Sequence, residues 1–534
     1  MDVKQKTVWT GYFLSWAVTA AVGFGIVSQP SLLTGYGLLM MVFLIPIIAI
    51  LFLPSVSLQM RFITLFCSPL LAILLVLDPV EIGLYGHDPY MFSMVDLNEL
   101  QSGNLGNMLE SLAWPGMYSL ALVVDHTTAA KTLTVAKYLP LLSSTIPLIY
   151  YIGIRRLTDE PIAFVSAMAF ASLRSIYIFE SKFVDEFLAI ILFISILTVI
   201  FTIQNAKRKG VLLVLMILTI SITHHATAIF LLLLLILWIL TPHLLSRSFV
   251  PERFQPCKIN SRHQTGIYAI IGILTVWLLL TGNPEYSGYL ISLVQEAVTT
   301  GETARQSGGF AAPTPNIVAL IARGAVIPIG IFCFLVAYRV ISAERLSGRE
   351  LGWSIFAGVV GIIYGISLVG GDIIPLYSGR MLIYWAPALI IVALPGVKYL
   401  FPQRETLKKV LLLCLLFSFV ATQVTAIRPH AMYSDKSTTS MYEGHYTPAQ
   451  FEASDWTSEY VTDNFIIGEE RGLWNQSGTP FKYPYWSPDK CDVYVWRIES
   501  GESLPRNRSI VYSAGDIQLH TCTPSRSSSF NETS

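Results

Sequence analysis

Long apolar stretches separated by short polar segments fill the chain up to about residue 426. A helix needs about 20 apolar residues to cross a bilayer, and about thirteen stretches approach that length. The two stretches on either side of His224 and His225 are short and nearly continuous. The pattern predicts an all-α polytopic membrane protein with spans near 9–29, 32–54, 62–78, 136–154, 161–178, 185–203, 211–223, 225–240, 265–282, 317–338, 351–370, 381–397 and 410–426.

The composition supports this interpretation. Hydrophobic residues make up 53% of the 534 positions and charged residues only 13%, whereas a typical soluble domain has about 25% charged residues. So little charge excludes a soluble enzyme, a disordered chain and a coiled coil. Lysine plus arginine and aspartate plus glutamate both number 35, so the formal net charge is zero and no basic excess exists to hold a nucleic-acid backbone. We therefore expect membrane lipid around the protein and no nucleic-acid partner.

Lysine and arginine are distributed unevenly between the short loops. If the N-terminus is cytoplasmic, the short loops on that side hold clusters such as Arg155-Arg156 and the basic run at 207–209, and few basic residues fall in the opposite short loops. Such a bias favours the cytoplasmic side of a membrane protein. The chain is thus predicted to be a multi-pass protein of the cell membrane with a cytoplasmic N-terminus, and about thirteen spans then place the C-terminal segment outside.

The segment after residue 426 differs in character from the rest. It is polar, aromatic and turn-rich, and it contains the three Asn-x-Ser/Thr sequons of the chain, which fits an outside location. We expect a transmembrane domain at 1–426 and a small extracytoplasmic C-terminal domain at 427–534. Cys491 and Cys522 lie in this segment; they form a disulfide in an oxidising compartment or remain two buried free thiols.

Two outer loops are long, at about 79–135 and 283–316. Within the first, the apolar residues from Leu105 to Ala130 have helical spacing around Trp114-Pro115. This spacing predicts an interfacial helix that lies on the membrane surface.

Ionisable residues at a membrane edge are costly to place there, so they indicate where chemistry is carried out. The densest acidic cluster opens the first outer loop and includes His87-Asp88-Pro89-Tyr90. A carboxylate at a water–lipid boundary can serve as a general base, and the aromatic Tyr90 beside Asp88 suits a sugar-binding surface. Alternatively, Asp88 caps a helix that begins at Pro89; the two roles are compatible.

Cationic and imidazole groups are predicted on the same side. Arg174 and Lys182 flank an outer turn, as binding groups or as part of an ion-paired turn with the acids that follow. His224 and His225 occupy another outer bend. Adjacent residues on a helix diverge by about 100°, so a hydrogen bond to phosphate or carboxylate fits them better than joint metal binding. Arg380 opens the twelfth span as a phosphate clamp or as a side chain that snorkels to the interface.

Together these groups could bind an anionic lipid headgroup and deprotonate a hydroxyl. The sequence contains no Gly-x-x-x-x-Gly-Lys loop, no His-Glu-x-x-His and no Gly-x-Ser-x-Gly, so ATP-driven work and zinc peptidase chemistry lack support. We expect Asp88, Lys182, His224 and Arg380 to converge on one cavity open to lipid.

In layout the sequence resembles the GT-C superfamily of membrane glycosyltransferases, in its archaeal versions. The shared features are an array of spans with a cytoplasmic N-terminus, a first outer loop with an acidic motif at His87-Asp88-Pro89-Tyr90, a helix with Trp114-Pro115 and an external end domain. The resemblance implies a polyprenyl-phosphate-linked sugar donor and a glycan, lipid or glycoprotein acceptor, as in protein glycosylation or cell-envelope assembly. It also implies that Asp88 acts as a base or binds a metal, so no cofactor is certain and a divalent cation stays open.

Two departures from the family pattern affect the function. Family loops often carry paired acids, whereas here His87 precedes Asp88, and the Trp-Trp-Asp-Tyr-Gly motif of oligosaccharyltransferases is absent, which puts transfer of whole glycans to asparagine in doubt. The alternatives are a transporter or flippase of polyprenyl-linked sugars, and a non-catalytic anchor for the tail. Transporters tend to place their sites at broken spans near mid-membrane, whereas the charges here cluster at one face, which favours an enzyme.

Overall fold

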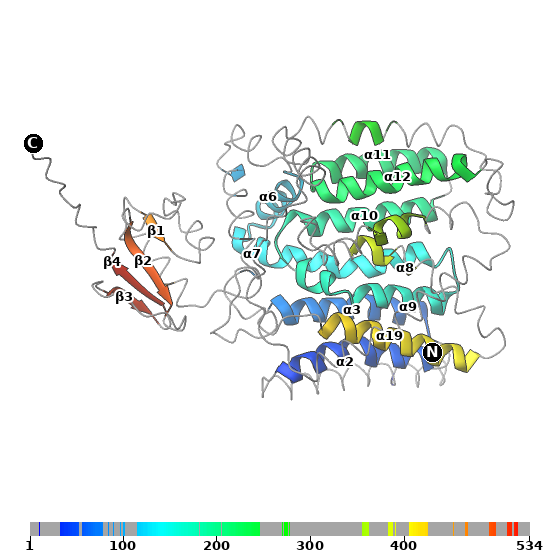
Figure 1. Ribbon diagram of the computed structural model, residues 1–534, viewed down its shortest axis with the longest axis horizontal. Coiled ribbons are helices and arrows are strands. Elements are labelled where there is room, and N and C mark those ends of the chain that lie inside the picture. Colours follow the sequence, from blue (N-terminus) through cyan, green and yellow to red (C-terminus); the bar gives the residue numbers. More distant parts are fainter. Residues whose placement is uncertain are drawn as a thin grey trace, which may run out of the picture.

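The computed structural model describes chiefly residues 32–52, 56–77, 115–180, 182–203, 205–245, 272–275, 355–362, 383–387 and 405–425, four short strands of the tail and a few isolated positions. Figure 1 shows the long helices lying side by side as one array, with α6 and α7 at one end. The helices are α2 (Leu32–Phe52), α3 (Leu58–Leu77), α6 (Gly116–Thr128), α7 (Thr132–Tyr138), α8 (Ile146–Ile154), α9 (Glu160–Ala171), α10 (Asp185–Thr202), α11 (Ala206–Ser221), α12 (His225–Leu245) and α19 (Glu405–Thr425).

Most helices in this part of the chain coincide with predicted spans. The spans at 32–54, 62–78, 185–203, 211–223, 225–240 and 410–426 correspond to α2, α3, α10, α11, α12 and α19. One helical stretch of the described residues, Thr132–Ile154, is long and apolar enough to cross a membrane by length and composition, and several shorter apolar stretches accompany it. The predicted spans at 9–29, 265–282, 317–338, 351–370 and 381–397 lie largely outside the described residues.

Two predicted spans are interrupted. The span at 136–154 comprises the end of α7, the 3₁₀ helix η2 (Leu139–Thr145) and α8. Pro140 is the second residue of η2, and Pro147 is the second residue of α8. A proline removes a backbone hydrogen bond from the interior of a helix but is tolerated in its first turn, so the helical stretch is divided at these two positions. The span at 161–178 is α9 followed by a five-residue π-helical turn, η3 (Ser175–Phe179).

The main hydrophobic core unites the long helices. Buried aromatic side chains such as Phe43, Phe164, Phe170 and Tyr177 fill it, and Phe43 of α2 packs against Tyr177 of η3 with ring centroids 5.8 Å apart. Because these contacts join segments far apart in sequence, the core fixes the order of the helices across the array.

A second buried cluster joins the first outer loop to the start of α10. Phe183 and Phe187 pack there with Met117 of α6, and Leu84 and Leu97 of the loop belong to the same cluster. Phe183 directly follows Lys182 in the chain. The cluster therefore holds the loop against the segment that carries one of the predicted binding residues.

The predicted interfacial helix at 105–130 is confirmed as a helix in its second half. Helix α6 starts after Pro115 and ends at Ala129, which adopts a left-handed conformation with φ of 51°. It buries Met117, Tyr118 and Ala121, and Val123 on another face is 59% exposed. This difference between faces is what an interfacial helix requires; residues 105–114 lie outside the described part.

The tail contains a sheet that the apolar pattern did not predict. Strands β1 (Phe465–Ile467), β2 (Cys491–Arg497), β3 (Ile510–Ala514) and β4 (Ile517–Thr521) are ordered β1-β2-β4-β3. Only the β1–β2 pair is parallel. The all-α description therefore applies to the helical array and not to the tail. Cys491 begins β2, and Cys522 lies outside the described residues, so the disulfide stays a prediction.

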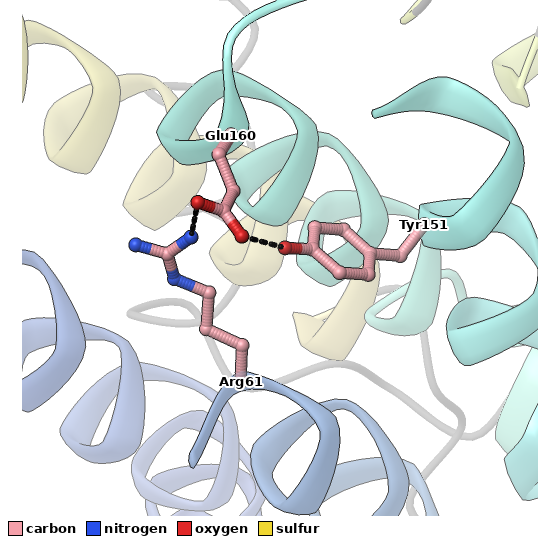
Figure 2. A network of polar contacts seen from close by, with 3 residues as sticks. All are labelled: Arg61, Tyr151 and Glu160. Atoms are coloured by element: carbon pink, nitrogen blue, oxygen red, sulfur yellow. Dashed lines mark hydrogen bonds and ion pairs between the residues drawn. The ribbon is translucent and has the colours of Figure 1, made fainter. Parts of the chain in front are cut away.

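An ion pair and a hydrogen bond join helices α3, α9 and α8 (Figure 2). Arg61 of α3 and Glu160 of α9 approach to 2.7 Å between Nη1 and Oε2. The hydroxyl of Tyr151 of α8 donates to Glu160 Oε1 at 3.1 Å. The predicted spans at 32–54 and 62–78 leave Arg61 in the loop between them, but α3 begins at Leu58 and includes it.

The charge of Glu160 is stabilised by this network. Glu160 precedes the predicted span at 161–178, and its side chain is 44% exposed. Partial burial alone would raise the pKa of Glu160, but the hydrogen bond and charge of Arg61, with help from Tyr151 and Arg155, hold it below its ordinary value.

We expect Glu160→Gln to lower the free energy of unfolding by about 0.5 kcal/mol at pH 7, because partly exposed ion pairs contribute little. The folded-state pKa is lowered, so this contribution is complete above the ordinary glutamate pKa and is lost as the pH falls through the lowered value. Unfolding of the detergent-solubilised protein at pH 7 and under acid conditions measures it. A double-mutant cycle with Arg61→Gln should show coupling, and strict additivity would contradict the pair.

Candidate functional site

The predicted site residues fall into two groups. Asp88, His87, Tyr90 and Arg380 lie outside the described residues. The other four, Arg174, Lys182, His224 and His225, are described. Lys182 precedes Phe183, which packs in the cluster with Met117 of α6, and His224 follows Thr223, which lies against Gly116 of α6. The predicted convergence of Asp88 and Arg380 with them on one cavity therefore stays a prediction.

The segment between α9 and α10 holds Arg174 and Lys182. The backbone N–H of Arg174 donates to Gln423 Oε1 of α19 at 3.2 Å, and Ser143 Oγ of η2 donates to the carbonyl oxygen of Glu180 at 2.9 Å. Two distant helical segments thus hold this connection, including its π-helical turn. Such turns often occur at functional sites.

Charged side chains in this region are buried. Lys182 is 2% exposed, Glu180 0% and Glu186 4%, and Lys137 of α7 is 6% exposed. Burial of charge is costly unless partners or function compensate it. The sequence predicted Lys182 as a binding residue, which stays a prediction, and nothing in its local pattern signalled that Glu180 is more deeply buried.

His224 and His225 form the junction of α11 and α12. Helix α12 begins at His225, so His224 precedes the helix and the 100° divergence expected of adjacent helical residues does not apply. The two ring centroids lie 4.9 Å apart at an interplanar angle of 47°. Among the described residues, no group of three or more His, Cys, Asp or Glu side chains could hold a metal ion.

A chain of hydrogen bonds leads from His224 into the array. His224 Nδ1 lies 2.8 Å from Thr227 Oγ1, which lies 2.7 Å from the hydroxyl of Tyr384. Tyr384 stands one helical turn after Arg380 in the sequence. No local sequence pattern signals the contact between Thr227 and Tyr384, because 157 positions separate the two residues.

The start of α6 lies directly against this junction. The N–H of Gly116 donates to the carbonyl oxygen of Ile222 at 2.9 Å. A Cβ on Gly116 would overlap Thr223 Oγ1 and would lie 3.2 Å from Thr223 Cα. Glycine is therefore required for this close approach, which brings the start of α6 to the turn before His224.

Replacing Gly116 with alanine should lower the free energy of unfolding by about 2 kcal/mol, because overpacking a tight contact usually costs that much. Thr223→Ala in the same chain should recover part of the loss by removing the overlapping hydroxyl. Thermal unfolding in detergent measures both. Gly210→Ala is the matched control: its Cβ meets nothing within 4 Å in helix α11, so it should stabilise slightly. Equal effects at Gly116 and Gly210 would contradict the close contact.

Solved structures of other proteins share the fold of this chain, although their sequences differ greatly from it. No family model and no curated protein matches the sequence. Among solved structures, ArnT from Cupriavidus metallidurans bound to undecaprenyl phosphate matches with a TM-score of 0.53 and 11% identity, over 88% of this chain and 99% of that chain. The oligosaccharyltransferase of Archaeoglobus fulgidus in the apo form matches with a TM-score of 0.50 and 12% identity, over 78% of this chain and 64% of that chain.

The chain has a GT-C-like fold. The oligosaccharyltransferase AglB of Archaeoglobus fulgidus, in complex with an inhibitory peptide and a dolichol-phosphate, matches with a TM-score of 0.50 and 10% identity, over 78% of this chain and 63% of that one. The chain thus spans less than two thirds of the archaeal enzyme's length. This GT-C-like fold agrees with the resemblance expected from the sequence.

Proposed function

We propose that this chain is a multi-pass membrane glycosyltransferase that moves a sugar from a polyprenyl-phosphate-linked donor to a glycan, lipid or protein acceptor. The observation that carries the proposal is the burial of Lys182 and His224 in a GT-C-like fold, each next to a residue that contacts α6. Two structures of this fold, ArnT and AglB, hold undecaprenyl phosphate and dolichol-phosphate. Buried cations and imidazoles are suitable partners for such a phosphate.

In this proposal the end that carries Lys182 is the outer face. The N-terminus is cytoplasmic, residues 1–426 form the transmembrane domain and residues 427–534 form an extracytoplasmic domain. The orientation is supported by Arg61, Arg155 and Arg156, which lie at or beside the ion-paired end of the array. Basic residues favour the cytoplasmic side; Glu160 of the ion pair begins α9, whereas Lys182 follows the C-terminal end of α9.

The proposed reaction is a direct displacement with inversion. The acceptor oxygen forms a bond to the anomeric carbon, the bond from that carbon to the phosphate oxygen breaks, and polyprenyl phosphate leaves. Asp88 takes the acceptor proton. Lys182, Arg380 and His224 or His225 stabilise the charge that builds on the phosphate.

Further residues have binding roles in the same proposal. His87, Tyr90 and Arg174 contact the sugar or the phosphate of the donor. Leu84, four positions before Asp88, packs in the cluster with Phe183, next to Lys182, which supports joining the acidic loop to this site. No step is assigned to a cofactor; a divalent cation held by Asp88 would supply further charge stabilisation to the phosphate.

A turnover assay separates an enzyme from a transporter. The purified protein in proteoliposomes receives radiolabelled polyprenyl-phosphate sugars together with candidate acceptors, and free polyprenyl phosphate and labelled acceptor are quantified. Production of both in equal amounts supports the glycosyltransferase. Movement of intact donor between leaflets without bond cleavage would overturn it in favour of the flippase or transporter.

A further inference from the structure

The hydrogen bonds around His224 determine where its ring proton lies. The backbone N–H of Thr227 points to His224 Nδ1 at 3.4 Å, and a backbone N–H can only donate. Nδ1 must therefore accept, and the ring proton of neutral His224 lies on Nε2. The reverse tautomer would bring two N–H groups against each other.

The remaining protons of the network follow from this assignment. Thr227 Oγ1 lies 2.8 Å from an accepting nitrogen, so its hydroxyl donates to Nδ1. A hydroxyl has one proton, so Thr227 must accept from the hydroxyl of Tyr384 at 2.7 Å. The chain of donors thus runs from Tyr384 to Thr227 to His224.

Tyr384 is held in a fixed orientation. Its ring stacks on Phe230 of α12 with centroids 4.3 Å apart and an interplanar angle of 18°, and it meets Phe193 of α10 edge-on at 5.5 Å. The side chain is 2% exposed. Two helices therefore orient the hydroxyl that begins the donor chain.

We propose that Thr227 and Tyr384 are positioning residues that fix the tautomer of His224, so that Nε2 carries the proton and is the nitrogen that His224 offers to an anionic oxygen. Identification of that oxygen with the leaving phosphate of a polyprenyl-phosphate sugar rests on the proposed function. A neutral donor of fixed tautomer is ready for negative charge that develops in the transition state, without reorganisation during the reaction. Ionised Asp or Glu in place of His224 could not donate to that charge.

The tautomer can be read directly by ¹⁵N nuclear magnetic resonance of protein labelled at histidine. The chain has 9 histidines, and the His224 signal is the one that His224→Gln removes. In the unsubstituted protein the Nδ1 signal should have the shift of an unprotonated nitrogen and Nε2 that of a protonated one. A protonated Nδ1 in the neutral ring would overturn the proposal.

Variants separate positioning from general packing. Thr227→Val and Tyr384→Phe should each raise the fraction of neutral His224 that is protonated at Nδ1. The increase should be about fivefold for Thr227→Val, which removes the direct hydrogen bond to the ring. Thr227→Ser keeps a hydroxyl and should give the spectrum of the unsubstituted protein. Tyr150→Phe is the matched control for Tyr384→Phe. It removes a buried hydroxyl that donates to the carbonyl oxygen of Pro387 at 2.7 Å. Pro387 is three residues after Tyr384 in the chain, but this bond does not involve Thr227 or His224, so the His224 signal should stay unchanged.

Kinetics connect the tautomer to transfer. Thr227→Val and Tyr384→Phe should lower kcat by about fivefold with the acceptor KM unchanged, while Tyr150→Phe leaves both unchanged. An unaltered His224 spectrum in both Thr227→Val and Tyr384→Phe would overturn the inference. If the spectra behave as expected but no donor is turned over, the positioning role stands and the proposed glycosyltransferase fails.

Discussion

Asp88→Asn should lower sugar transfer by about 10²- to 10⁴-fold, the range that a positioned general base contributes. Asparagine has nearly the same shape as aspartate but cannot take a proton from the acceptor hydroxyl. Donor affinity should therefore change little while kcat falls. Release of polyprenyl phosphate from radiolabelled donor, measured beside equilibrium binding of the donor, gives both quantities.

Asp125→Asn is the matched control for this substitution. Asp125 of α6 accepts hydrogen bonds from Gln101 at 3.1 Å and Thr132 at 3.0 Å, so it ties the same outer loop together without a proposed chemical role. Its replacement should lower thermal stability slightly and leave transfer intact. Equal transfer by Asp88→Asn and the unsubstituted protein would contradict the base assignment and require another carboxylate.

The pattern of apolar residues predicts the helices because the length and apolar character of each span depend only on the residues within it. The span predicted at 185–203 is α10 at Asp185–Thr202. The interruption at 136–154 was also readable, since Pro140 and Pro147 restart helices. In the tail, the two strand-like runs that form β3 and β4 are separated by Gly515-Asp516, a typical two-residue hairpin connection, which is a local signal that overall composition does not reveal.

The site was predictable by residue type and not by contact. The cost of placing charge at a membrane edge led to the prediction of Lys182 and His224 as site residues, and the structure shows both to be buried; their roles stay predictions. The partner of Thr227 could not be predicted, because Tyr384 is brought to it by the packing of helices distant in sequence. Likewise Gly116 gave no local signal; it is required by the close passage of α6 over Thr223. Such contacts depend on tertiary structure.

Lys182→Gln should lower kcat by about 10²- to 10³-fold, the loss seen when one preorganised group that stabilises developing negative charge is removed. The ammonium is buried at 2% exposure, and little water is present there to screen its charge, so its effect on a leaving phosphate is large. Lys182→Arg keeps the charge and should retain more activity than Lys182→Gln. Turnover at saturating donor measures the change.

Loss of a buried charge also destabilises a protein, by about 3–5 kcal/mol when a partner is left unpaired, so stability must be measured with activity. Lys137→Gln provides the comparison. Lys137 is likewise buried at this end of the array, at 6% exposure, with its ammonium 5.9 Å from the ring centroid of Tyr138, and has no role in the proposed reaction. Similar thermal destabilisation in both variants, with transfer lost only in Lys182→Gln, assigns the effect to phosphate stabilisation. Similar loss of sugar transfer in Lys182→Gln and Lys137→Gln would show that both buried charges stabilise the fold and that Lys182 has no specific role at the phosphate.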